Sequence, residues 1–203
     1  MVYTEKRGFT LLELLIVIGI LAILGTVAVL VLNPAQLFAQ ARDSQRIENL
    51  SAIRAALSYF IATVNGAELD YTGALSCSTM CFSAAAIGTA ADGCIGADVA
   101  RHGTKTSTID TDRTVDGTGW IPVEFSLIPS GAPLAALPVD PQNTTTYFFS
   151  YACDNTAKTF ELNANMESTR YAGGGTDDVE SNSKDGGNVA TIYEIGNAPG
   201  LSL

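Results

Sequence analysis

The chain has 203 residues, with 21 acidic and 11 basic side chains and a formal net charge of −10. This length is sufficient for one domain of ordinary size plus a long stem. From residue 66 onward there are 17 acidic and 6 basic side chains. The composition therefore argues against direct nucleic-acid binding by this part, because phosphate contacts need clustered lysine and arginine. It suits a solvated surface or a few cation sites.

The most informative segment is a short basic leader followed by a long apolar run. Lys6 and Arg7 precede Gly8, and a lone carboxylate, Glu13, precedes nineteen uncharged residues at 14–32. A helix of that length is about 28 Å long, close to the ~30 Å hydrocarbon core of a bilayer. We therefore expect a transmembrane helix with its N-terminus in the cytoplasm, following the positive-inside rule. A carboxylate in this setting is costly, so Glu13 is expected to have a partner.

Two simpler interpretations explain less of this segment. A cleavable secretory signal has an apolar stretch of about 7–15 residues and then a small-residue cleavage site. The uncharged run here, at residues 14–32, is longer than such a stretch. A plain single-pass anchor fits the hydropathy, but it gives no reason for Glu13 or for the Gly8-Phe9 junction.

The sequence Gly8-Phe9-Thr10-Leu11-Leu12-Glu13, with the apolar run behind it, resembles the type IV pilin family and its pseudopilin relatives. The resemblance covers roughly residues 1–60. It implies that a prepilin peptidase cleaves between Gly8 and Phe9, that the new amino group of Phe9 is methylated, and that Glu13 directs assembly. It also implies a homopolymer built by an inner-membrane assembly platform and its ATPase. The subunit is then expected in the cytoplasmic membrane before assembly and in an extracellular filament afterwards.

A second, amphipathic helix is predicted after the apolar run. Pro34 lacks a backbone donor and is expected to break or kink the helix. Apolar residues then recur three or four apart as far as Asn65-Gly66, a typical helix end. The opposite, solvent-facing side is expected to carry the charged residues Arg42, Asp43, Arg46, Glu48 and Arg54. The resemblance implies an α+β fold in which this long helix packs on a small antiparallel sheet.

Four cysteines, Cys77, Cys81, Cys94 and Cys153, lie beyond the apolar run. This places them on the exported side, where thiols oxidise. Two disulfides have three possible connectivities, and we expect one bridge within 77–94 and one to Cys153. A zinc site is the alternative, since Cys77 and Cys81 have tolerable ligand spacing. The other two cysteines are isolated, however, and the one histidine, His102, is expected at the solvated surface.

Alternating side chains predict the sheet. Residues 145–153 and 159–166 alternate around a turn at 154–158 and form a predicted hairpin. Residues 119–125 are a candidate edge strand because they contain Pro122, and residues 190–195 are a possible last strand. One face of the sheet is expected to pack on the amphipathic helix and the other to be solvated.

These features divide the chain into five parts. They are a leader (1–8), a transmembrane and filament-core helix (9–33), an amphipathic helix (34–65), a disulfide-tied loop region (66–118), and an antiparallel sheet with an acidic C-terminal loop (119–203).

No motif in the sequence indicates catalysis, so no catalytic residue and no enzymatic function are expected. Calcium is the one cofactor considered, because hard cations bind oxygen donors in flexible geometry. The glycine-rich loop supplies such donors at Asp177, Asp178, Asp185 and Asn188, although their spacing is not that of an EF-hand. Three functions remain open. They are a structural filament subunit, a pseudopilin of a type II secretion or DNA-uptake system, and a monomeric membrane-anchored binding module.

Overall fold

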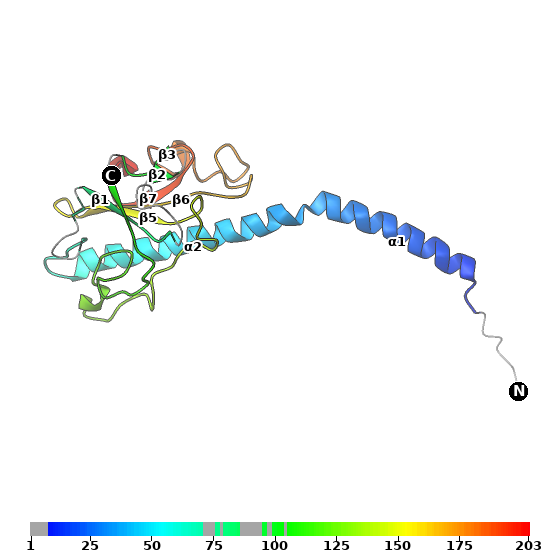
Figure 1. Ribbon diagram of the computed structural model, residues 1–203, viewed down its shortest axis with the longest axis horizontal. Coiled ribbons are helices and arrows are strands. Elements are labelled where there is room, and N and C mark those ends of the chain that lie inside the picture. The colour runs from blue at the N-terminus through cyan, green and yellow to red at the C-terminus, as the bar shows by residue number, and fades with distance from the viewer. Residues whose placement is uncertain (1–7, 71–75, 78, 86–94, 97–98, 104) are drawn as a thin grey trace, which may run out of the picture. The chain divides into compact units, whose positions relative to one another are not determined.

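The computed structural model describes residues 8–70, 76–77, 79–85, 95–96, 99–103 and 105–203 (Figure 1). The chain divides into two compact units, Met1–Phe38 and Ala39–Leu203, which are described in turn.

Helix α1 (Leu11–Leu32) makes up most of the first unit. It contains no charged residue after Glu13, so the helix has no charged face and its apolar surface is continuous. It ends at Asn33, whose φ of 40° is left-handed. Helix α2 (Pro34–Thr63) begins at the next residue. Proline is favoured at a first helical position because its missing N–H needs no partner there, so the regular helix is interrupted directly before Pro34.

In the second unit, α2 packs against a five-stranded sheet of order β4-β1-β5-β6-β7, and the predicted α+β class is confirmed. The strands are β1 (Met80–Ser83), β4 (Thr106–Ile109), β5 (Ser150–Asp154), β6 (Thr159–Ala164) and β7 (Tyr193–Gly196). All neighbouring pairs are antiparallel except β1 and β4. A separate ladder joins β2 (Ile95–Gly96) to β3 (Val99–Ala100). Three short helices complete the fold: η1 (Phe125–Leu127), α3 (Asn182–Asp185) and η2 (Pro199–Leu201).

The predicted hairpin is present as β5 and β6, and β7 occupies the end of the predicted last strand. Residues 119–125 form no strand, which corrects the predicted edge strand. Trp120, Ile121 and Val123 are all buried, so this segment lacks the alternation of an edge strand, and its backbone bonds locally. The Val123 N–H donates to the Ile121 carbonyl at 2.8 Å, and η1 follows. Two strands of the main sheet, β1 and β4, lie in the region expected to be loops.

One face of the sheet builds the main core against α2. Cross-strand partners Phe82, Tyr151, Leu162 and Ile195 lie in one row across four strands. They belong to the same apolar cluster as Leu50, Ile53, Leu57 and Phe60 of α2. The ring of Phe60 meets that of Phe125 edge-on at 5.8 Å, so η1 closes this core on the side of the helix.

The opposite face of the sheet is buried as well, which corrects the expectation of a solvated face. The adjacent row Ser83, Ser150, Asn163 and Glu194 is at most 1% exposed. The chain around residue 101 and the C-terminal tail both bond to this face. The Asn163 amide donates to the Arg101 carbonyl at 3.0 Å, and the Leu203 N–H donates to Glu161 at 2.9 Å.

His102 lies in this interior and not at the surface, contrary to the sequence-based expectation. It is 1% exposed. Its Nε2 lies 3.0 Å from the Ser150 hydroxyl, and its Nδ1 lies 3.4 Å from Glu161. Burial is the main cause that lowers the pKa of His102. The sequence around it is polar because it packs on a polar sheet face.

The charged face predicted for α2 is also partly wrong, because Asp43 and Arg46 are fully buried. The Arg46 guanidinium donates to Asp140 at 2.6 and 2.9 Å and to Asp43 at 2.7 Å. Asp43 in turn accepts the N–H groups of Glu167 and Ser168. This network, which we call the Arg46 network, fastens α2 to the segments on either side of the hairpin.

Candidate processing and assembly site

The candidate site begins at the start of α1, where Thr10 and Glu13 cap the helix reciprocally. Thr10 is the N-cap, with extended backbone (φ −82°, ψ 151°), and its hydroxyl accepts the Glu13 N–H at 3.2 Å. The Glu13 carboxylate accepts the Thr10 N–H and the Thr10 hydroxyl, both at 2.8 Å. This is a capping box, which satisfies backbone donors that a helix start leaves unpaired. The helix dipole favours a negative charge at the same place.

The partner of Glu13 in the uncleaved chain is therefore Thr10 of the same chain. The sequence analysis singled out Glu13 but did not identify Thr10. The signal was present, because a threonine followed three residues later by a glutamate before an apolar run is the capping-box pattern.

The junction between Gly8 and Phe9 is open. The Phe9 side chain is 87% exposed. A Cβ atom built on Gly8 meets no atom within 4 Å. The described chain therefore has room for a larger residue at position 8, and any requirement for glycine there has to come from the enzyme that handles the junction.

The surface of α1 is apolar and unburied. Every large apolar side chain described in α1 is between 47% and 81% exposed. Within the part of the chain that the structure describes, one helix is long and apolar enough to cross a membrane, and it begins at Leu11. A continuous apolar surface of this extent marks contact with lipid or with other protein.

The cysteines lie in the second unit. Cys77 and Cys153 form a disulfide with a Cα–Cα distance of 4.9 Å across 76 residues of sequence. It joins the segment before β1 to the end of β5. Cys81 is also disulfide-bonded, and Cys94 lies outside the described residues. The Cys77 bridge thus links the loop region to the hairpin.

Three of the four residues considered for calcium make local contacts with other groups. Asp177 pairs with Arg170. Asp178 accepts the N–H groups of Gly174, Glu180 and Ser181, and bonds to Ser181 and the backbone lower its pKa. Asp185 accepts from Gly187 and Glu194. Among the described residues, no group of three or more Asp, Glu, His or Cys side chains is placed to hold a metal ion. The arrangement gives the calcium hypothesis, including Asn188, no support.

Comparison with known proteins agrees with the site at the N-terminus. Residues 4–29 match the family model of the prokaryotic N-terminal methylation motif. This motif is the prepilin signature of type IV pilins and pseudopilins, so the resemblance carried by Gly8 to Glu13 is confirmed. No curated protein and no solved structure matches the chain. In its N-terminal signature the chain thus resembles type IV pilins and pseudopilins.

Proposed function

We propose that this chain is the structural subunit of a type IV pilus-like extracellular filament, polymerised from the membrane through its N-terminal helix. The observation that carries the proposal is the prepilin signature at residues 4–29, placed at the start of a long apolar helix with an unburied surface. A helix of this kind needs an apolar medium on every side. Lipid supplies it before assembly, and the helices of other copies supply it afterwards.

The chemistry of assembly follows from the geometry around Glu13. A prepilin peptidase removes residues 1–8 and leaves Phe9 with a free amino group, which is then methylated. This group is positively charged near neutral pH. Within one chain the amine and Glu13 are one helical turn apart. A neighbouring copy displaced along the axis offers its own Glu13 to that amine, and charge pairs in an apolar setting fix one register over others.

A pseudopilin of a type II secretion or DNA-uptake system uses the same signature and the same polymer chemistry, so it is the second candidate. A monomeric anchored module is the third, and it functions without cleavage. The assembly platform and its ATPase supply the work in the first two cases. The excess of acidic over basic side chains from residue 66 onward gives no reason to expect direct contact with nucleic acid.

The test is microscopy of sheared cell-surface material combined with mass spectrometry of any fibre found. The proposal expects fibres composed of this chain, with an N-terminus at methylated Phe9. Fibres seen only inside the cell envelope, or only on overexpression, favour the pseudopilin. A surface protein that begins at Met1 and forms no fibre would support the anchored module.

A further inference from the structure

Two opposite charges on α2 lack a partner within the described chain. Among the carboxylates of residues 8–70, 76–77, 79–85, 99–103 and 105–203, Glu48 alone accepts no hydrogen bond and forms no ion pair. Among the cationic side chains of the same residues, Arg54 and Lys184 likewise donate no hydrogen bond and form no ion pair. Glu48 and Arg54 are both exposed.

Glu48 and Arg54 of one copy do not pair with each other. Side chains meet along a helix when they are three or four residues apart, and these two are six apart. Six residues correspond to roughly 9 Å along the axis and about 120° around it. Each charge is therefore available to a partner outside its own chain.

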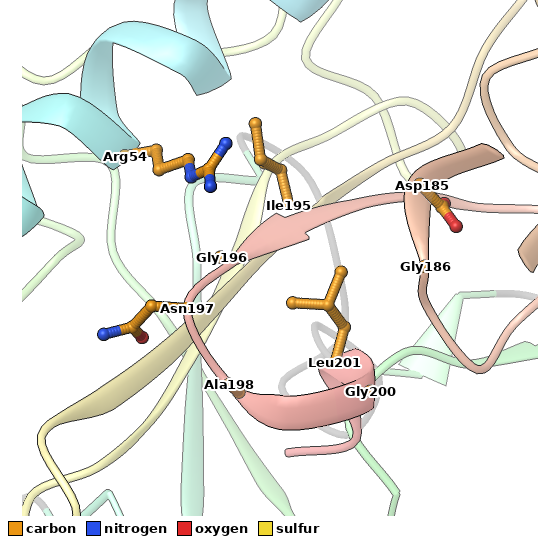
Figure 2. A pocket seen from close by; sticks show the side chains of 9 residues that line it. All are labelled: Arg54, Asp185, Gly186, Ile195, Gly196, Asn197, Ala198, Gly200 and Leu201. Carbon is orange, nitrogen blue, oxygen red and sulfur yellow. The ribbon is translucent and has the colours of Figure 1, made fainter.

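Arg54 also borders a pocket of about 290 Å³. The guanidinium extends from α2 towards Ile195 at the end of β7, and Asn197, Ala198 and Leu201 line the pocket below it (Figure 2). The one carboxylate in the lining, Asp185, already accepts the N–H groups of Gly187 and Glu194. The pocket is thus bordered by an exposed cation that forms no ion pair within the described residues.

We propose that Arg54 of one copy binds Glu48 of a second copy, with the Glu48 carboxylate entering the pocket beside Arg54. This inference rests on the proposed function, since it concerns the contact between copies in the filament. It explains why one acid and one base on the same helix both lack partners in a chain whose other described acids are all engaged. Small exposed residues on the same helix, Ser51, Ala55 and Ser58, leave room for a second chain to approach.

The pair specifies a direction as well as a contact. It joins different surfaces of the two copies, and contacts of this head-to-tail kind generate open helical filaments. Displacing the second copy by roughly 9 Å towards its N-terminus brings its Arg54 level with Glu48 of the first.

A charge-swap series tests the pair in the full chain. Arg54→Glu and Glu48→Arg should each reduce the filament recovered by shearing at least about tenfold, because like charges then face each other between copies. The double variant Glu48→Arg, Arg54→Glu should recover filament to near the wild-type amount. Lys184→Glu is the matched control, because it reverses an equally unpartnered charge outside the pocket lining, and it should assemble normally.

A cross-link gives a readout that does not depend on filament yield. A chain carrying both Glu48→Cys and Arg54→Cys should form disulfide-linked ladders within filaments, with the 48–54 linkage identified by mass spectrometry, while either single variant should not. Normal assembly of both single reversals, failure of the double variant to recover, or absence of the 48–54 linkage overturns the inference. These results leave the proposed function intact if the wild-type chain still forms filaments. Absence of wild-type filaments overturns both.

Discussion

Asn163 and Glu194 lie directly opposite each other on β6 and β7, on the sheet face away from α2. Both are buried, and each has an oxygen without a hydrogen-bond partner, Asn163 Oδ1 and Glu194 Oε1. Burial is the main cause that raises the pKa of Glu194, and the charges of Glu161 and Asp185 raise it further. When Glu194 holds a proton, its carboxyl can donate a hydrogen bond. Neither of the two unpaired oxygens can otherwise do so, since both are acceptors.

The first prediction is that this proton makes stability fall as pH rises. A folded pKa above the unfolded value means that the native state binds more protons between the two values, so the free energy of unfolding decreases through that window. Glu180 acts in the same direction, because burial raises its pKa to about 7. His102 opposes them below its ordinary pKa, since burial disfavours its charged form. The pH dependence of the wild-type free energy of unfolding therefore combines the effects of Glu194, Glu180 and His102. A variant is needed to isolate the effect of Glu194.

Glu194→Gln keeps the shape and removes the titration. We expect its melting temperature in detergent to match that of the wild type near pH 5 and to exceed it at pH 8, by about 2–4 °C for each kcal/mol recovered. Asp110→Asn, at an exposed carboxylate, should leave the pH profile unchanged. Parallel profiles for Glu194→Gln and the wild type would show that Glu194 does not titrate in this range.

The second prediction concerns the Arg46 network. Arg46→Met should lower the free energy of unfolding by about 3–5 kcal/mol, because it leaves Asp43 and Asp140 buried without their cation. Arg42→Met removes a partly exposed partner of Glu167 and should have a much smaller effect. Denaturant titration of both variants gives the comparison. Equal losses would mean that burial of the network contributes nothing beyond ordinary surface pairing.

The third prediction is that the Cys77–Cys153 bridge stabilises the second unit. Cys77→Ser should cost about 2–4 kcal/mol, since the bridge restricts a long loop of the unfolded chain. The double variant Cys77→Ser, Cys153→Ser should be no less stable than the single one, because the bridge is already lost. Intact mass after alkylation reports the thiols. A reactive thiol at position 77 in the wild-type protein would contradict the bridge.

The fourth prediction concerns processing. Gly8→Val should accumulate uncleaved precursor in the membrane, although the chain itself has space for the valine side chain. Immunoblots of membrane fractions distinguish the two lengths. Normal conversion of Gly8→Val would show that the peptidase does not require a small residue there, whereas degradation of the variant would show a folding defect that the structure does not explain.

The fifth prediction is that Glu13→Gln separates processing from assembly. The amide keeps the shape and the capping contacts to Thr10, so membrane insertion and cleavage should be normal. Filaments should be lost or sharply reduced, because the Phe9 amine then has no counter-charge between helices. Thr10→Val provides the comparison, since it weakens the cap and keeps the charge. Normal filaments from Glu13→Gln would show that the pairing of Glu13 with the Phe9 amine does not set assembly.

The two long helices and the central hairpin were predictable because they depend on local patterns. The apolar run, the break near Pro34 and the alternation of β5 and β6 are all properties of neighbouring residues. The N-terminal signature could be recognised for the same reason, since Gly8, Phe9 and Glu13 belong to one short motif.

The rest depends on segments far apart in the chain. β1 and β4 join the sheet from a region without clear periodicity, and the pairing of β1 with β5 and of β4 with β1 is set by tertiary contacts. Arg46 has the charge of a surface residue, and its burial depends on Asp140, which is distant in the sequence, as well as on Asp43 of the same helix. His102 is buried because the chain around it bonds to the polar sheet face. No local pattern reports such contacts.

The exposed apolar surface of α1 bears on what would drive assembly of the proposed filament. A side chain that moves from lipid into a bundle of similar helices passes from one apolar environment to another. The hydrophobic effect therefore contributes little to the free energy of this transfer. In the proposed filament, growth would therefore gain little free energy from hydrophobic burial. It would depend on charge pairs between subunits and on the work done by the assembly ATPase.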